Sequence, residues 1–358
     1  AKHIHLAISG HGFGHLSQIT AVTNCLLANS PSLQVSIQSA LRQHDVAQFI
    51  NSSFLYKETQ LDVGMVQLNP LQVDHHASFA SYKQFHQQYD SKLQQQKDRL
   101  ARLQPDLVLA DIPYLTIQAA SELKIPTIAI ASLSWDYIVE SYFDNTNALV
   151  KSWLETIQHA YSLTDSALLP EPAMPARNFK HSRTIEPIIN RGVKVPDIRT
   201  KLAISNSDNR PLVLCSLGGI NNAPIPIKSL SAQSDFHWLV VNGLSDSDNV
   251  HCIRHCNIPY RDLLASVDAL VGKPGYGMAV EAIAHNIPFV FARRGDFPDE
   301  PFIIEWLTNN GRIMEIPMIQ WLKGDFTTAL KQLLAATKPP SISCNGASQA
   351  ANIIAQHL

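Results

Sequence analysis

Short apolar runs alternate with helix-like segments along the chain, and this alternation limits the possible folds more than any other feature. In the first half, buried strands are expected at residues 4–9, 33–38, 107–110 and 127–131. The pattern restarts in the second half, with strand-like runs at residues 212–215, 238–241, 269–271 and 289–291. Strands that alternate with helices form parallel sheets covered by helices. The sequence therefore predicts two α/β domains.

The segments between these runs suggest where the domains begin and end. Residues 82–103 are polar but keep apolar positions at helical spacing, which predicts a surface helix. The stretch 165–196 contains five prolines and no clear periodicity, as is typical of a connection between domains. We therefore expect an N-terminal domain over 1–175 and a C-terminal domain over 176–342. The last segment, 343–358, is expected to form a helix that caps one domain, with the first domain as the candidate.

Charge and cysteine content exclude several classes of protein. With 28 Lys and Arg against 30 Asp and Glu, the chain has no basic surplus that would indicate nucleic acid as a partner. Five scattered cysteines do not form the framework of a small disulfide-rich domain and are typical of a reducing cytoplasm. The first apolar stretch ends at Gly10, too soon for a signal peptide or a membrane span. We therefore expect a cytoplasmic protein without a transmembrane segment.

A glycine-rich loop, residues 9–15, follows the first strand and precedes a helix. Its glycines allow a sharp turn and close approach of a ligand to a helix N-terminus. The spacing is G-x-G-x-G rather than G-x-G-x-x-G, and the end of the next strand, near Gln38, offers no acid for a ribose hydroxyl. A dinucleotide site is therefore disfavoured. The G-x-x-x-x-G-K-[ST] motif of P-loop proteins is absent from the sequence.

Two further glycine turns, at residues 216–219 and 272–277, lie in the second half. Backbone N–H groups at the positive end of a helix suit a diphosphate, and Lys273 would add a formal charge. Glycines also occur at ordinary strand-to-helix turns, so a purely structural role remains open.

Four segments, 10–15, 133–137, 272–281 and 288–302, together resemble the GT-B glycosyltransferases. Within that group the chain is similar to UDP-sugar glycosyltransferases, to the lipid-linked peptidoglycan N-acetylglucosaminyltransferase, and to the N-terminal glycosyltransferase-like region of L-arabinokinases. The resemblance implies two Rossmann-like domains with parallel sheets facing across a cleft. It also implies a nucleoside-diphosphate sugar as donor, most simply a UDP-sugar, with no cofactor.

The resemblance also assigns catalytic roles in the first domain. It places His15 as the general base on the acceptor hydroxyl and Asp111 as the acid that orients it. His11 is the rival base because it lies on the same glycine-rich loop. A neutral imidazole can accept the hydroxyl proton, and a carboxylate on its other nitrogen stabilises the imidazolium. The acceptor side is implied to include Gly12, Phe13, Gly14, Trp135 and Asp136. Helix capping by His15 and Asp111, and packing by Trp135, remain open.

In the second domain the resemblance assigns the donor. Lys273 and the turn Gly275-Tyr276-Gly277 would hold the diphosphate with Ser216, Gly218 and Gly219. Glu281 would bind the ribose hydroxyls, since a carboxylate can accept two hydrogen bonds from a diol. Asp299 and Glu300 would hold the sugar, while Arg293 and Arg294 would bind either phosphate or an acid such as Asp296 or Glu300. In the plant-type UDP-sugar glycosyltransferases, the positions that match Gly277 and Met278 hold phosphate-binding residues. This difference leaves the sugar and base of the donor open.

The leading hypothesis is an inverting, metal-independent sugar transfer to an unidentified hydroxyl acceptor. A nucleotide-sugar 2-epimerase, for which Asp136, Asp299 and Glu300 would supply acids, and a sugar-nucleotide sensor without activity are the alternatives. Residues 251–256 contain two His-Cys pairs, but alternation along a strand would place these ligands on different faces, so no metal site is expected. A homodimer is left open.

Overall fold

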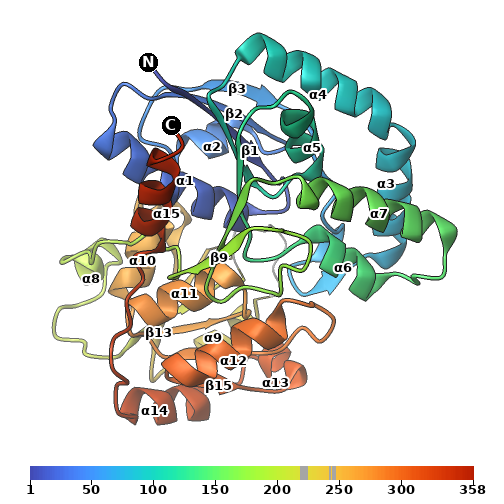
Figure 1. The fold of residues 1–358 in the computed structure, drawn as a ribbon. Helices are drawn as coiled ribbons and strands as arrows, with labels where there is room; N and C mark the ends of the chain where they lie inside the picture. Colours follow the sequence, from blue (N-terminus) through green and yellow to red (C-terminus); the bar gives the residue numbers. More distant parts are fainter. Residues whose placement is uncertain (218–224, 242, 244–246) are drawn as a thin grey trace. The chain divides into compact units, whose positions relative to one another are not determined.

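The computed structural model describes residues 1–217, 225–241, 243 and 247–358. The chain divides into two compact units (Figure 1). The first unit contains residues 1–68, 73–189 and 344–358, and the second contains residues 69–72 and 190–343. The small sheet formed by β4 (Gln67–Asn69) and β5 (Gln72–Val73) contributes its turn to the second unit.

The first unit, in which every residue is described, is built on a seven-stranded parallel sheet with the order β3-β2-β1-β6-β7-β8-β9. Its strands are β1 (His3–Ile8), β2 (Gln34–Ser39), β3 (Leu55–Glu58), β6 (Leu107–Asp111), β7 (Thr127–Ile130), β8 (Ser166–Pro170) and β9 (Ser182–Ile185). Its helices are α1 (Phe13–Asn29), α2 (Gln43–Ala47), α3 (His75–Gln87), α4 (Tyr89–Leu103), α5 (Tyr114–Glu122), α6 (Trp135–Tyr142), α7 (Ala148–Ser162) and α15 (Gly346–Ala355).

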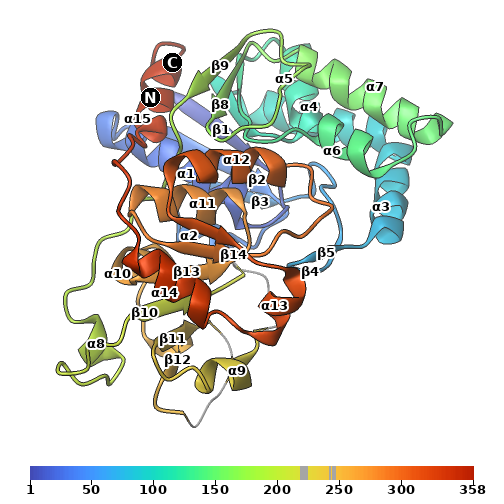
Figure 2. The same ribbon diagram turned by 90° about the horizontal axis from the view of Figure 1, so that it is seen from below.

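The described part of the second unit contains a six-stranded parallel sheet with the order β12-β11-β10-β13-β14-β15. Its strands are β10 (Leu212–Cys215), β11 (His237–Val240), β12 (Val250–Cys252), β13 (Ala269–Gly272), β14 (Phe289–Phe291) and β15 (Ile313–Glu315). Its helices are α8 (Ile198–Lys201), α9 (Ile227–Ser231), the 3₁₀ helix η1 (Ile253–His255), α10 (Tyr260–Ser266), α11 (Tyr276–Ala284), α12 (Glu300–Asn310), α13 (Met318–Lys323) and α14 (Thr327–Ala335). Helices α11 and α12 lie side by side (Figure 2).

The central strands of the second sheet are apolar because this sheet has a hydrophobic core on each face. Successive side chains of a strand point to opposite faces. In β10, Leu212 and Leu214 belong to one core cluster, whereas Val213 and Cys215 belong to the other. Burial of each large aliphatic side chain is worth about 1.5–3 kcal/mol, so these strands contribute strongly to the stability of the second unit.

The strand order reverses once in each sheet, and this point locates the ligand sites of open α/β sheets. In the first unit the reversal lies between β1 and β6, where Ile8 is paired with Asp111. In the second unit it lies between β10 and β13, where Cys215 is paired with Val271. The glycine-rich loops found in the sequence follow β1, β10 and β13, so each unit carries them at its switch point.

The connecting segments differ from the sequence-based expectation in two places. The proline-rich stretch 165–196 contains β8 and β9, which extend the first sheet, so the first unit runs to residue 189 rather than 175. The surface helix expected over 82–103 is two helices, α3 and α4, which meet at Gln88. They separate because α3 packs on α7 whereas α4 packs on α5. The last helix, α15, packs on α1 in the core of the first unit.

Candidate functional site

His15 and Asp111 form a buried pair at the switch point of the first unit. His15 lies in the first turn of α1, and Asp111 ends β6. The Nδ1 atom of His15 is 2.6 Å from Oδ1 of Asp111, and the two residues are 5% and 1% exposed. The Ser9 backbone N–H donates to the Asp111 carbonyl at 2.8 Å, which ties the loop before α1 to the end of β6. The hydrogen bond expected from the sequence is therefore present.

This geometry gives the two nitrogens of His15 different environments. The N–H at Nδ1 donates to the carboxylate, which fixes the ring and stabilises its charged form. Burial raises the pKa of Asp111, and the charge and hydrogen bond of His15 oppose that rise. The second carboxylate oxygen, Oδ2, is buried without a hydrogen-bond partner in the described structure. A helix-capping role for His15 alone does not explain this arrangement.

His11, the rival base, has a different setting from His15. Its ring meets Trp135 edge-on, with ring centroids 5.2 Å apart. It also lies against Gly64, whose φ is +66°. Residues other than glycine rarely adopt this backbone conformation. A Cβ atom at Gly64 would come within 2.7 Å of the His11 ring. Gly64 therefore allows the close packing that holds His11.

The expected acceptor-side residues of the glycine-rich loop differ in their surroundings. Gly12 begins α1 as its N-cap with a φ of +84°, and a Cβ atom at either Gly12 or Gly14 would meet nothing within 4 Å. The Phe13 ring stacks on Phe49, with centroids 6.1 Å apart, and packs against the hydrophobic core. The backbone of the loop is thus accessible at Gly12 and Gly14, while the Phe13 side chain packs the loop against the core.

Trp135 and Asp136 are both buried at the start of α6. Trp135 is 1% exposed, and its indole N–H donates to Oδ2 of Asp62 at 2.8 Å. Asp136 accepts a hydrogen bond from the side-chain amide of Asn178. Trp135 therefore has the packing role that the sequence left open. Its ring packs beside that of His15, and the two ring centroids are 5.8 Å apart.

The donor residues expected in the second unit gather around its switch point. Ser216 follows β10, and its backbone N–H donates to the Val271 carbonyl at 3.0 Å. Gly272 must lack a side chain, since a Cβ atom there would lie 2.6 Å from the carbonyl oxygen of Ser216. Gly275 is the N-cap of α11, and Tyr276 and Gly277 form its first turn. Gly218 and Gly219 lie outside the described residues.

Two titratable side chains here have strongly shifted pKa values. Burial lowers the pKa of Lys273 to about 8, and the nearby charge of Arg294 acts in the same direction, whereas Asp299 and Glu300 oppose it. Burial raises the pKa of Glu281 to about 8, opposed by Arg261. Such shifts are typical of functional sites. At neutral pH the Lys273 side chain is mostly charged and that of Glu281 is mostly neutral.

Glu300 forms a structural ion pair, which was the alternative to phosphate binding by Arg294. Its carboxylate accepts from Nε of Arg294 and, at 2.9 Å, from the backbone N–H of the same residue. The two side chains are only 4% and 2% exposed, and the Arg294 guanidinium lies over the Phe297 ring. Arg293 pairs instead with Glu315. The Glu300 carboxylate is thus bound within the loop, and Asp299 lies 3.9 Å from the same guanidinium.

Sequence reasoning missed Asp62 and Gly64. They belong to the segment between β3 and β4, which has no regular secondary structure and no hydrophobic periodicity. The available signal was the sequence Asp62-Val63-Gly64, an acid next to a glycine beyond a strand. That pattern alone does not distinguish a site from a turn.

His251, from the two His-Cys pairs considered as metal ligands, is hydrogen-bonded to another histidine. Nε2 of His251 lies 2.9 Å from Nδ1 of His237, whose Nε2 lies 2.9 Å from Asp208. Within the described ranges, no group of three or more His, Cys, Asp or Glu side chains is arranged to hold a metal ion.

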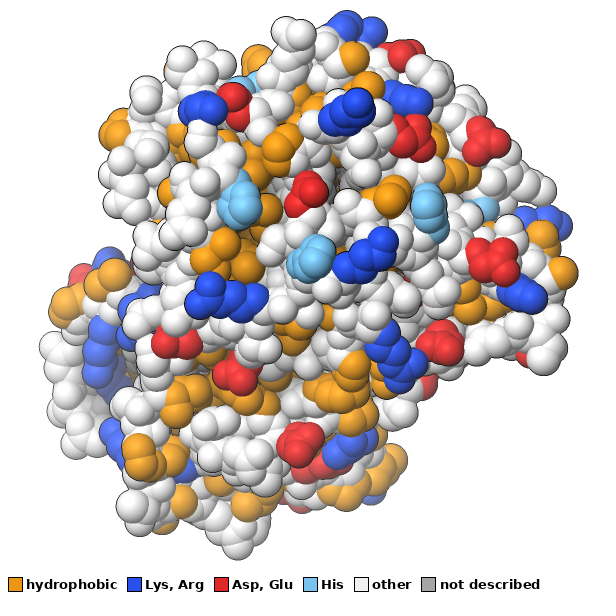
Figure 3. All heavy atoms as spheres, viewed as in Figure 1, with side chains coloured by type: hydrophobic (Ala, Val, Ile, Leu, Met, Phe, Trp, Pro, Cys, Tyr) orange, Lys and Arg blue, Asp and Glu red, His pale blue; other side chains and the backbone are white. Residues whose placement is uncertain are grey.

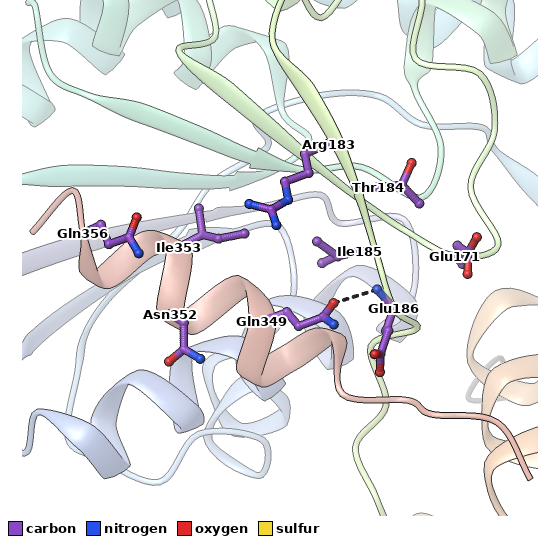
Figure 4. Close-up of a pocket in the computed structure, with 9 residues that line it drawn as sticks. All are labelled: Glu171, Arg183, Thr184, Ile185, Glu186, Gln349, Asn352, Ile353 and Gln356. Atoms are coloured by element: carbon purple, nitrogen blue, oxygen red, sulfur yellow. Dashed lines mark hydrogen bonds between the residues drawn. The ribbon is translucent and has the colours of Figure 1, made fainter.

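A groove of about 520 Å³ lies in the first unit, between β9 and α15 (Figure 4). Arg183 and Thr184 line it from the strand, and Gln349, Asn352 and Gln356 line it from the helix. Gln349 accepts a hydrogen bond from the backbone N–H of Glu186, which closes part of the strand edge. The site residues named above do not line this groove.

Charged side chains of both signs are interspersed on the face drawn in Figure 3. This matches the formal net charge of −2. Over the described residues, no helix combines the length and the apolar character needed to cross a membrane.

Comparison with known proteins gives relatives in sequence. L-arabinokinase of Arabidopsis thaliana is 26% identical over 362 residues, which cover 99% of this chain and 34% of that protein. An uncharacterized glycosyltransferase of Methanosarcina acetivorans is 24% identical over 233 residues, which cover 60% of this chain and 57% of that protein. The chain thus matches about a third of the first relative's length and just over half of the second's. No protein-family model matches the chain.

Solved structures resemble the whole chain. The calicheamicin glycosyltransferase CalG4 has a TM-score of 0.70 at 16% identity, over 100% of this chain and 98% of its own. The glycosyltransferase VinC, solved in complex with dTDP, has a TM-score of 0.58 at 16% identity, over 99% of this chain and 94% of its own. These matches confirm the resemblance seen in the sequence. The chain therefore has the GT-B fold, with two Rossmann-like α/β units, that glycosyltransferases such as CalG4 and VinC share.

Proposed function

We propose that this chain is a glycosyltransferase that moves a sugar from a nucleoside-diphosphate sugar, most simply a UDP-sugar, to an acceptor hydroxyl with inversion. The observation that carries the proposal is the buried His15–Asp111 pair at the switch point of the first unit. Relatives and structural neighbours that are glycosyltransferases support it, as does VinC, whose structure contains a nucleoside diphosphate. We assign the acceptor to the first unit and the donor to the second.

The donor half of the proposal rests on three features of the second unit. Lys273 supplies a positive charge, the N-terminus of α11 supplies oriented N–H groups, and both suit a diphosphate. Glu281, one and a half turns into α11, supplies oxygens for the ribose hydroxyls. Because Lys273 and the helix carry the leaving-group charge, the proposal includes no metal ion and no cofactor.

The chemical step follows from these assignments. Nε2 of His15 takes the proton of the acceptor hydroxyl as its oxygen attacks the anomeric carbon. The bond from that carbon to the diphosphate oxygen breaks, and the electron pair leaves with the nucleoside diphosphate. Attack from the side opposite the leaving group inverts the anomeric centre. Asp111 stabilises the imidazolium that forms.

The acids that would favour a 2-epimerase are largely committed elsewhere. Glu300 binds Arg294 and Asp136 binds Asn178. An assay that follows nucleoside-diphosphate release from UDP-, GDP- and dTDP-sugars, with and without hydroxyl acceptors, separates the hypotheses. A transferase releases the diphosphate faster when acceptor is present. Conversion of the donor sugar without acceptor would indicate an epimerase, and binding without turnover would indicate a sensor.

Replacing Glu281 with alanine is expected to weaken binding of the donor nucleotide by about 1–3 kcal/mol, the usual loss when a hydrogen bond to such a group is removed. Glu281→Gln is the matched control, because an amide resembles the protonated acid that a pKa of about 8 implies at neutral pH. We expect it to retain most of the affinity in a calorimetric titration. Wild-type affinity in Glu281→Ala would remove Glu281 from the site.

Donor affinity is expected to fall above pH 8, as Lys273 loses its charge. With a pKa of about 8 in the empty site, the dissociation constant should rise about tenfold between pH 7 and 9. Lys273→Arg stays charged over this range and should flatten the dependence. Both proteins are best measured with Glu281→Gln present, since Glu281 titrates over the same range. An equal pH dependence in the arginine variant would assign the effect to another group.

A further inference from the structure

Asp62 is a buried acid that none of the assignments above uses. It is 4% exposed and lies in the irregular segment between β3 and β4. Its Oδ2 atom accepts the indole N–H of Trp135 at 2.8 Å, and the nearby Ser9 side chain lowers its pKa. Both residues belong to segments that surround His15: Ser9 follows β1, and Trp135 begins α6. Asp62 is therefore hydrogen-bonded to the start of α6 and lies near the end of β1.

Trp135, which is hydrogen-bonded to Asp62, also packs against the His15 ring. Ring centroids of Trp135 and His15 are 5.8 Å apart, and the two planes are tilted by 51°. The backbone of Trp135 is fixed as well, because its N–H donates to the Tyr161 hydroxyl at 3.2 Å and that hydroxyl donates to the Ile112 carbonyl at 3.0 Å. With both ends of Trp135 held, its ring has one position beside the imidazole.

We propose that Asp62 is a positioning residue for His15, which holds the Trp135 ring against the imidazole and favours the imidazolium through its negative charge. Asp111 contacts the imidazole directly, whereas Asp62 acts across the indole. The catalytic importance of this arrangement rests on the proposed function, but the arrangement itself is a property of the folded chain.

The electrostatic surroundings support this role. Burial raises the pKa of Asp62, and the charge of Asp111 acts in the same direction, while the nearby Ser9 hydroxyl, the charge of His15 and the hydrogen bond from Trp135 lower it. Other ionisable groups near the pair include His11, Asp111 and the buried Asp136 of α6, together with three buried tyrosines. Burial raises the pKa of these tyrosines well above 10, so they stay neutral: Tyr82, Tyr114 and Tyr161. Asp62 and Asp111 are thus the acids that balance a charged His15.

The test is the pKa of His15 itself, followed by NMR of protein labelled in its histidine rings, with the signal assigned by its loss in His15→Gln. Asp62→Asn keeps the acceptor for Trp135 and removes the charge. We expect it to lower the His15 pKa by about 1 unit, the scale for losing a nearby opposite charge. Asp106→Asn is the matched control, since Asp106 immediately precedes β6 and is about 16 Å from Asp111 by strand geometry. It should leave the His15 pKa unchanged.

Trp135→Phe is the second variant. It keeps the aromatic ring but removes the N–H that lowers the pKa of Asp62, so it should lower the His15 pKa by less than Asp62→Asn does. An unchanged His15 pKa in both variants, or an equal shift in Asp106→Asn, would overturn the proposal. This measurement needs no substrate. A shift in His15 without any sugar transfer would therefore leave this inference standing while the proposed function failed.

Discussion

Replacing His15 with alanine is expected to lower the rate of sugar transfer by roughly 10²–10⁴, the typical contribution of a general base. Donor affinity should change little, because we assign the nucleotide to the second unit. Initial rates at saturating donor, together with calorimetric donor titration, separate the two effects. Thermal unfolding of the variant checks that the loss of the Asp111 partner has not unfolded the first unit.

Two further variants make this test specific. Asp111→Asn keeps the shape of the pair but removes the charge that favours imidazolium, so we expect a smaller loss than in His15→Ala. His11→Ala should retain most of the activity, since His11 has the packing role beside Trp135 and Gly64. Full activity in His15→Ala with loss in His11→Ala would reassign the base to His11. Full activity in both would favour the sensor hypothesis.

Glu300→Gln is expected to destabilise the second unit by about 1–3 kcal/mol, because it removes the nearer carboxylate from the buried charge of Arg294 and leaves Asp299, 3.9 Å away, as an acidic partner. The prediction follows from the burial of both side chains and from the two contacts that one carboxylate makes to Arg294. Urea unfolding followed by a signal from the second unit gives the change in free energy.

The exposed pair Arg293–Glu315 provides the control. Its Nε–Oε1 distance is 3.1 Å, and its two side chains are 41% and 42% exposed. Glu315→Gln makes the same chemical change and should cost about 0–1 kcal/mol. Equal costs in the two variants would contradict the structural role of Glu300. A loss of donor affinity with unchanged stability in Glu300→Gln would restore the sugar contact expected from the resemblance.

The main features of the fold were predictable because local sequence patterns determine them. Strands such as residues 212–215 are apolar on both faces, which predicts a buried parallel sheet. Strand ends then locate His15 and Asp111, since the carboxyl ends of neighbouring parallel strands meet at one edge. Strands β8 and β9 were missed because the prolines around them disrupt the pattern that marks a strand.

Several features of the site depend on contacts between segments that are distant in the sequence. The sequence alone does not predict such contacts. The hydrogen bond between Asp62 and Trp135 joins residues 73 positions apart, and neither residue indicates the other in the sequence. The Arg294–Glu300 pair was recognised as an alternative, but its burial, which decides its role, arises only in the folded unit. The likeness to solved structures gives the fold, whereas the residues that bind donor and acceptor remain to be tested by substitution.

Calorimetric titration with a panel of UDP-, GDP- and dTDP-sugars would show whether the chain binds a nucleotide sugar at the residues we assign to the donor. We predict that at least one of them binds the wild-type chain with a dissociation constant between about 1 μM and 1 mM, the usual range for enzyme substrates. Binding of that same nucleotide sugar should be abolished or weakened by at least tenfold when Lys273 and Glu281 are both replaced by alanine. Failure of the whole panel to bind at millimolar concentration, or equal affinity in the double variant, would contradict this assignment.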